Sequence, residues 1–235
     1  MKLKDYIVAT IKPWNVRVYH EVIKKYPGRW HLVTAPDQLT VSLVDKLQPA
    51  YIFFPHWSVT VPKEILTRAE CIGFHMTDLP FGRGGSPLQN LIQRGCRETM
   101  VSAIRLTEKF DAGPVYLKQA LSLEGLAEEI FVRSADVIAA IILKIVKTKP
   151  VPRKQVGPGT VFKRRSPAES EVTQEVKSLK ELFDFIRMLD ASGYPRAYIK
   201  YNNYKIEFSR PALRARGIQA DVNIALSDGD DHDQT

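Results

Sequence analysis

The sequence has few cysteines and no long apolar run. Only Cys71 and Cys96 occur in its 235 residues, with neither a CxxC spacing nor a companion group of histidines. We therefore expect no disulfide framework and no metal site, and we interpret both thiols as reduced and structural. No stretch approaches the length of a membrane span, and MKLKDYIVAT holds too short an apolar stretch for a signal peptide. A cytoplasmic protein without a membrane partner is expected.

Two nucleotide-binding signatures are also absent. The turn after the first apolar run reads TIKPWN, which lacks the GxGxxG pattern that lets a backbone approach a pyrophosphate. The glycine-rich residues 82–85 are not followed by the GK[ST] of a P-loop. The sequence therefore predicts neither an NAD site nor a P-loop.

Positive charge is what the sequence has in excess. The net charge is +8, and it would be +12 without the four aspartates of the final stretch, DGDDHDQT. Such a surplus suits a polyanion such as RNA, and it equally suits a small substrate that carries phosphates or carboxylates. Charge alone does not choose between these partners.

The apolar pattern predicts one α/β core. With 44% hydrophobic residues, the chain can fill one large domain with an appendage. Strands separated by helices of about a dozen residues predict a doubly wound, mostly parallel sheet, closed by a long helix over 124–147. The predicted strands are 5–11, 30–34, 50–54, 70–75, 99–107 and 115–123.

The composition changes after the long helix. Residues 149–171 are rich in proline, glycine and basic side chains, so they mark a boundary that follows a core over 1–150. Beyond this boundary, 178–190 read as a helix and 195–213 as a hairpin that turns at Asn202 and Asn203. We expect a small C-terminal α+β appendage over 151–217 and a disordered tail over 218–235.

One stretch combines a histidine with an unusual loop. Residues 73–91, GFHMTDLPFGRGGSPLQNL, place His75 where an apolar run gives way to glycines and prolines. The carboxyl ends of strands are where open α/β sheets bind their ligands, and histidine is the side chain suited to proton exchange at neutral pH. Taken alone, His75 is equally compatible with a hydrogen-bonded core histidine.

The motifs HMTDLPFGRGGSPLQNLI and FDAGPVYLK resemble those of the formyltransferase family that uses 10-formyltetrahydrofolate. In that family a histidine, a Pro-Arg-Gly loop and a DxGP turn follow in this order, and the similarity extends over about residues 50–210. The resemblance implies a Rossmann-like formyltransferase core and a folate formyl donor. It also implies that His75 and Asp111 are catalytic, the histidine handling a proton and the carboxylate orienting it.

Further site residues are predicted from their places beside these motifs or, for Trp14 and Asn15, at the end of the first predicted strand. Trp57 directly follows a predicted strand and either walls the cofactor pocket or belongs to the core. Arg83 either braces its own loop or meets phosphates or the glutamate tail of folate. The predicted cofactor-binding residues are Trp57, Ser58, Leu106 and Gly113, and the predicted substrate-binding residues are Arg83, Trp14 and Asn15.

The chain departs from the family pattern at Gly73, where the family has an asparagine. That asparagine is thought to hold the formyl oxygen as charge develops, and losing one such donor typically costs about 10²–10³ in turnover. Three replacements stay open: His56 at the end of the neighbouring strand, Asn90 in the helix after the loop, and free backbone N–H groups in the Gly-Gly turn.

The acceptor amine is predicted from the size of the C-terminal region. Family members that formylate methionyl-tRNA carry a full-size C-terminal barrel, and this chain has little room for one. We therefore predict N-formylation of a nucleotide-linked amino sugar for glycan biosynthesis. A nucleic-acid partner is disfavoured but left open, and so is a homodimer. The alternatives are a short methionyl-tRNA formyltransferase, which the positive charge favours, and a module that binds folate or RNA without catalysis.

Overall fold

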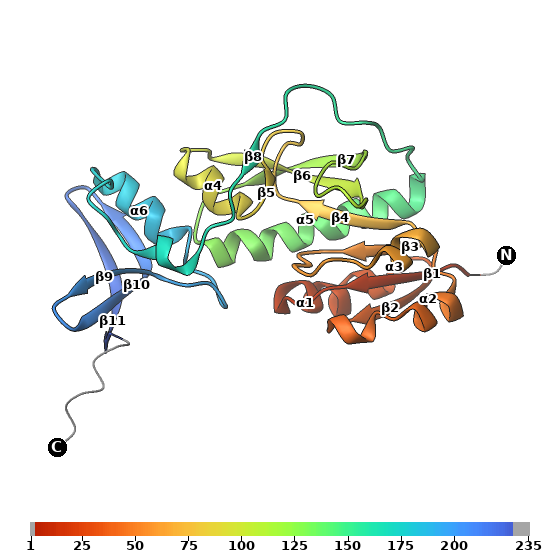
Figure 1. Cartoon of the computed structure of the whole chain (residues 1–235), viewed down its shortest axis with the longest axis horizontal. Coiled ribbons are helices and arrows are strands. Elements are labelled where there is room, and N and C mark those ends of the chain that lie inside the picture. The colour runs from red at the N-terminus through yellow and green to blue at the C-terminus, as the bar shows by residue number, and fades with distance from the viewer. Residues whose placement is uncertain (1–2, 228–235) are drawn as a thin grey trace, which may run out of the picture. The chain divides into compact units, whose positions relative to one another are not determined.

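The structure is a computed structural model that describes residues 3–227. The chain separates into two compact units (Figure 1). The first unit holds the chain up to Pro87 together with Glu98–Ser122 and Phe131–Phe162. The second unit holds Leu88–Arg97, Leu123–Ile130 and the chain from Lys163 onwards.

A six-stranded sheet forms the centre of the first unit, with strand order β2-β1-β3-β4-β6-β7. The first four strands in this order pair in parallel, whereas β6 is antiparallel to β4 and β7 is antiparallel to β6. The strands are β1 (Asp5–Ala9), β2 (Arg29–Val33), β3 (Tyr51–Phe54), β4 (Cys71–His75), β6 (Glu98–Arg105) and β7 (Val115–Ser122). The predicted fold class, a doubly wound and mostly parallel α/β sheet with a small C-terminal appendage, is confirmed.

The core strands are apolar without alternation because they are buried on both faces. Ile7, Ile52 and Phe53 are completely buried in β1 and β3. The helices of this unit are α1 (Pro13–Glu21), α2 (Val41–Leu47), α3 (Lys63–Arg68) and most of α5 (Ala127–Thr148), with 3-10 turns at Ile23–Lys25 and Pro36–Gln38. Within residues 3–227, no helix combines the length and the apolar content that crossing a membrane requires.

Part of the segment predicted as a linker belongs to the first unit. Its strand β8 (Val161–Phe162) pairs in parallel with β5 (Arg83–Gly84) in the glycine-rich loop. Arg153 forms two backbone hydrogen bonds with Val115 of β7, at 2.7 and 2.8 Å. The chain after α5 therefore returns along the loop that follows His75.

The second unit contains a three-stranded antiparallel sheet in the order β11-β10-β9. Its strands are β9 (Ala197–Tyr201), β10 (Tyr204–Arg214) and β11 (Gly217–Leu226), and its helices are α6 (Leu179–Arg187), nearly all of α4 (Pro87–Gln93) and a 3-10 turn at Pro167–Ser170. The hairpin predicted to turn at Asn202 and Asn203 is present between β9 and β10.

The prediction of disorder from residue 218 is wrong as far as Leu226. Over Gly217–Leu226, β11 pairs with β10 and alternates apolar with small or polar residues, which is a strand pattern. The rest of the predicted tail, 228–235, lies outside the described residues.

Candidate active site

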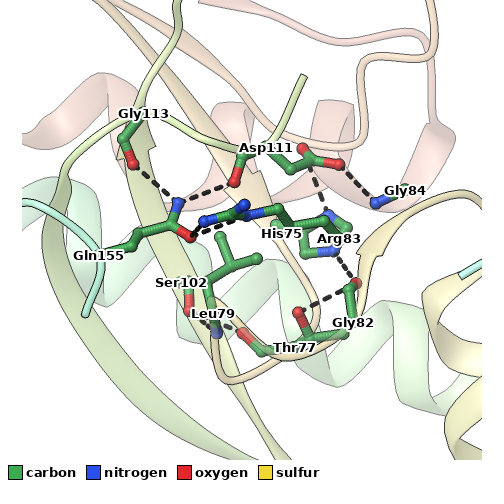
Figure 2. A network of polar contacts seen from close by, with 10 residues as sticks. All are labelled: His75, Thr77, Leu79, Gly82, Arg83, Gly84, Ser102, Asp111, Gly113 and Gln155. Atoms are coloured by element: carbon green, nitrogen blue, oxygen red, sulfur yellow. Dashed lines mark hydrogen bonds and ion pairs between the residues drawn. The ribbon is translucent and has the colours of Figure 1, made fainter. Parts of the chain in front are cut away.

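His75 lies at the carboxyl end of β4 and is 8% exposed. Its Nε2 is 2.7 Å from the carbonyl oxygen of Gly82, so this nitrogen carries the proton and donates it (Figure 2). The other ring nitrogen, Nδ1, faces Asp111 with 3.6 Å to Oδ1, which is too long for a hydrogen bond. In the neutral form of this ring Nδ1 carries no proton, and a proton arriving there would form an ion pair with the Asp111 carboxylate.

Asp111 is held by the glycine-rich loop. Its backbone is left-handed, with φ 51°, and its Oδ2 accepts a hydrogen bond from the Gly84 N–H at 2.9 Å. Gly84 has φ 97°, and a Cβ at that position would lie 2.5 Å from the carbonyl oxygen of Phe162. Only glycine fits this approach without strain, so the loop sequence fixes the position of the Asp111 carboxylate.

The side chain of Gln155 joins three segments at this site. Its Nε2 donates to the carbonyl oxygens of Asp111 at 2.7 Å and Gly113 at 2.8 Å. Its Oε1 accepts from Arg83, at 3.0 Å from Nε and 2.7 Å from Nη2 (Figure 2). Arg83 therefore braces its loop, the alternative kept open from the sequence. Gln155 was missed because nothing in its Pro/Gly-rich surroundings signals a long-range amide contact.

The start of the loop is fastened to the neighbouring strand. Ser102 on β6 lies opposite His75 in the register and is completely buried. Its hydroxyl donates to the carbonyl oxygen of Thr77 at 2.7 Å and accepts from the Leu79 N–H at 3.4 Å. This buried hydroxyl thus fixes the turn that carries the chain away from the histidine.

The backbone N–H groups of residues 82–85 all have acceptors. The first two donate to Thr160, at 2.7 Å to its Oγ1 and 2.9 Å to its carbonyl oxygen. The third donates to Asp111, and the fourth to the carbonyl oxygen of Phe162 at 3.2 Å. The prediction that this turn leaves N–H groups free for an oxyanion is therefore wrong, because the segment 160–162 returns to pair with it.

Both ring nitrogens of His56 are also engaged. Nδ1 lies 3.0 Å from the Trp14 indole nitrogen and 2.9 Å from the Asn15 amide nitrogen, both of which donate to it. Nε2 then carries the proton and faces Ser134 Oγ at 3.3 Å and Met76 Sδ at 3.4 Å. This arrangement leaves neither nitrogen for the oxyanion role considered from the sequence.

The surroundings of His56 also contradict the prediction that Trp14 and Asn15 contact the substrate. Trp14 and Asn15 are 4% and 3% exposed and direct their donors at His56. They support a histidine and are not at a surface that a substrate could reach, contrary to their prediction as substrate contacts. Burial, with a smaller contribution from the Lys12 cation, lowers the pKa of His56 to about 4, so its ring is neutral at pH 7.

This lowered pKa gives a pH dependence of stability. Histidine in an unfolded chain titrates near about 6.5, so between that pH and about 4 the unfolded chain binds a proton that the folded chain does not. The contribution of His56 to the free energy of unfolding is thus complete above the unfolded pKa. It should be lost as the pH falls towards 4, by up to about 3 kcal/mol.

Urea unfolding across this pH range measures the effect. His56→Gln keeps an acceptor for Trp14 and should flatten the dependence, whereas His20→Gln, at an exposed position on α1, should retain it. Parallel pH profiles for the two variants would contradict the assignment to His56.

Asn90 lies in the other compact unit. Its side-chain nitrogen donates to the carbonyl oxygen of Lys163 at 3.2 Å, and its Oδ1 accepts from Arg94 at 3.0 Å. Both ends of the amide are thus used inside the second unit, whereas His75 belongs to the first. None of these contacts supports Asn90 as an oxyanion donor.

Comparisons with known proteins identify the family. A methionyl-tRNA formyltransferase from Clostridium thermocellum has a solved structure that is 46% identical, with a TM-score of 0.90, and the match covers 96% of this chain and all of that one. The chain belongs to the formyltransferase family. The family model of the methionyl-tRNA formyltransferase C-terminal domain also matches residues 167–225.

A more distant relative and a structural neighbour each match over only part of their own length. The methionyl-tRNA formyltransferase of Rickettsia felis is 28% identical over 176 residues, which cover 72% of this chain and 57% of the relative. The chain thus spans little more than half of that relative. HypX from Aquifex aeolicus, solved in complex with tetrahydrofolic acid, is 16% identical with a TM-score of 0.71, covering 90% of this chain and 38% of HypX. That likeness shows a shared fold.

These comparisons overturn the predicted acceptor. The relatives at 28% and 46% identity are both named for methionyl-tRNA, so the prediction of a nucleotide-linked amino sugar and of glycan biosynthesis is wrong. The preference against a nucleic-acid partner is overturned as well, because both relatives are named for a tRNA. The length of the C-terminal region misled the interpretation, because the C. thermocellum protein is matched over its whole length by a chain of this size.

Leu106 occupies the space beside Gly73, where the formyltransferase motif has its asparagine. A Cβ at residue 73 would lie 2.5 Å from Cδ2 of Leu106, so any larger residue requires the leucine to move. The glycine that replaces the family's asparagine is therefore accompanied by a leucine, Leu106, that fills the space beside it. Gly73 therefore has an apolar neighbour at the position where the family pattern places a polar side chain.

The structure distinguishes among the predicted folate contacts. Leu106 and Trp57 both pack against the core cluster that includes Phe54 and Cys71. The indole N–H of Trp57 is buried and has no hydrogen-bond partner among the described residues, at a typical cost of about 1–3 kcal/mol. A bound ring with an acceptor would remove that cost, so these two residues fit a folate.

The other two predicted folate contacts, Ser58 and Gly113, have no unpaired polar group like that of Trp57 among the described residues. Ser58 is exposed, next to Trp57. Gly113 is required sterically, because a Cβ there would lie 1.8 Å from the carbonyl oxygen of Arg105. Its own carbonyl accepts from Gln155, which places Gly113 in the frame around Asp111.

Proposed function

We propose that this chain is a short methionyl-tRNA formyltransferase, which moves a formyl group from 10-formyltetrahydrofolate to the amine of methionyl-tRNA. The observation that carries the proposal is the 46% identity to the C. thermocellum protein over 96% of this chain. The family model matched at residues 167–225 and the net charge of +8 agree with a tRNA acceptor. The tetrahydrofolic acid in HypX, which shares the fold, supports the formyl donor.

The folate supplies the formyl group when it is bound, and Trp57 and Leu106 are the residues that would hold it. The unpaired indole N–H of Trp57 offers a hydrogen bond, and the Leu106 side chain offers apolar contact. Among the described residues, no cluster of three His, Cys, Asp or Glu side chains could hold a metal ion. The proposed chemistry is therefore assigned to side chains and backbone groups around His75.

His75 is the proton acceptor in this proposal. As the amine nitrogen bonds to the formyl carbon and the bond between that carbon and the folate nitrogen breaks, the amine loses a proton and the folate nitrogen gains one. Nδ1 of His75 would take the proton from the amine and would return it to the departing folate nitrogen. The Asp111 carboxylate, 3.6 Å away, stabilises the imidazolium that results. The carbonyl oxygen of Gly82 holds Nε2–H at 2.7 Å and so fixes both the tautomer and the plane of the ring.

The direct test uses purified protein with 10-formyltetrahydrofolate and initiator methionyl-tRNA, and follows formylmethionyl-tRNA on acid gels. We expect turnover that requires the aminoacylated tRNA and is abolished with uncharged tRNA. If the protein is folded by circular dichroism and yields no formylmethionyl-tRNA, the proposed acceptor is overturned.

Replacing Gln155 should impair catalysis more than folding. Gln155→Ala removes the donor to the carbonyl oxygens of Asp111 and Gly113 and should lower kcat by about 10-fold to 10²-fold with KM for tRNA little changed, because the carboxylate loses its fixed position. Gln155→Glu keeps the acceptor for Arg83 but not the amide donor, so it should stay defective. The exposed neighbour Lys154→Ala is the matched control. Full activity in Gln155→Ala would remove it as a positioning residue.

A further inference from the structure

A pocket of about 180 Å³ lies within the second unit, where the three chain segments of that unit meet. Residues 95–97, which follow α4, form one side of it, and Glu124 lies between β7 and α5. The rest of the wall comes from α6 and from Leu213 of β10. This volume is room for about six water molecules or for one small ligand.

Positive charge exceeds negative charge in the wall of this pocket. The wall includes three cations, Arg97, Lys180 and Arg187, and two carboxylates, Asp184 and Glu124. Both oxygens of Asp184 are already used, because Lys180 pairs with Oδ2 and Arg187 Nε donates to Oδ1 at 2.6 Å. Arg97 is exposed, and its guanidinium has no hydrogen bond or ion pair among residues 3–227. The wall therefore offers a positive charge to a ligand.

Arg187 has donors that the protein does not use. Only 6% of its side chain is exposed. Nη1 donates to the carbonyl oxygens of Leu123 at 2.6 Å and Gly125 at 2.8 Å, and Nε is bound to Asp184. Nη2 has no acceptor within the described part of the chain. Because buried N–H groups in folded proteins are nearly always hydrogen-bonded, the two N–H groups of Nη2 indicate an acceptor from outside the chain.

We propose that this pocket binds the phosphate group of a phosphate ester, held by Arg187, Arg97 and Lys180. Arginine N–H groups match phosphate oxygens in geometry, and a tetrahedral phosphate accepts from donors on different sides, whereas a carboxylate is planar. Phe183 and Leu213 add apolar surface for the carbon part of the ester. A free phosphate ester and the backbone of an RNA offer the same group, so the binding experiment includes both. The proposal does not depend on which amine the enzyme formylates.

Cys96 lines the same pocket, so its thiol reports whether the pocket is occupied. Cys71 is only 2% exposed, and iodoacetamide should therefore alkylate Cys96 first in the folded protein. Glycerol phosphate at about ten times its dissociation constant should slow this alkylation about tenfold, because only the empty pocket reacts. Glycerol, which lacks the phosphate, should not slow it. Titration calorimetry with glycerol phosphate gives the dissociation constant independently.

Three variants test the assignment to this pocket. Arg97→Ala removes a cation that holds no other part of the described chain, and it should raise the dissociation constant by about 10-fold to 10²-fold. Leu213→Trp fills the pocket without changing its charge and should abolish binding. Leu213 is 41% exposed, so the fold tolerates the larger ring. Arg216→Ala makes the same charge change in the turn between β10 and β11, outside the wall, and it should bind as the unmodified protein does.

Uncharged tRNA distinguishes the two sources of the phosphate. If tRNA protects Cys96 and Arg97→Ala weakens that protection, the site binds a phosphate of an RNA. If glycerol phosphate protects Cys96 and tRNA does not, the site binds a free phosphate ester, and both results support a phosphate site. Alkylation that neither compound slows, protection that persists in Leu213→Trp, or an equal effect of Arg97→Ala and Arg216→Ala would each overturn the proposal.

Discussion

His75→Asn is expected to lower the turnover number by at least about 10²-fold while changing folate affinity only several-fold. Asparagine retains an N–H that can reach the carbonyl oxygen of Gly82, so the loop keeps its partner. It has no group that accepts a proton, and the amine must then lose its proton to water. The loss falls on the transition state, so kcat should drop while binding of the folate persists.

Asp111→Asn should have an effect of the same order for a different reason. The amide oxygen can still accept from the Gly84 N–H, so the loop geometry is preserved while the negative charge beside His75 is removed. The imidazolium then forms without its counter-ion. The matched control is Asp78→Asn. Asp78 lies in the same loop, and its largely exposed carboxylate pairs with Lys118 of β7. Unchanged turnover in either site variant would remove that residue from the mechanism.

The sheet and the position of His75 were accessible to sequence reasoning because they rest on local patterns. Ile52 and Phe53 lie in a short continuous apolar run, and such runs signal strands buried on both faces. The glycines after His75 signal a loop wherever they occur. The family motif then added Asp111, which no local pattern distinguishes from a turn residue.

What the sequence did not predict depends on contacts between distant segments. Gln155 reaches Asp111 across 44 positions, and Trp14 reaches His56 across 42. The two-residue strands β5 and β8 are too short to carry any periodic pattern, yet their pairing occupies the N–H groups that glycines alone would leave free. The glycines therefore predicted the position of the loop correctly. They also predicted that its backbone N–H groups are free, which is wrong because these groups are hydrogen-bonded.

Methionyl-tRNA formylation should be strongly sensitive to salt. A tRNA acceptor binds through many phosphates, and a protein that neutralises six to ten of them loses about 10³–10⁵ in affinity between 50 and 200 mM salt. The net charge of +8 provides the cations for such binding. We therefore expect kcat/KM for methionyl-tRNA to fall by at least about 10³ over that interval.

Two comparisons separate tRNA binding from a general salt effect. The KM for 10-formyltetrahydrofolate should change far less, because the folate carries only its few carboxylates. Lys163 is exposed and begins the basic run Lys163-Arg164-Arg165. If its side chain contacts a phosphate, Lys163→Ala should reduce the slope of log affinity against log salt by about 1. Lys24→Ala, an exposed lysine of the first unit, is the matched variant and should leave the slope unchanged. A fall in kcat/KM of less than about tenfold would mean that few phosphates are contacted, which contradicts a tRNA acceptor held by this positive charge.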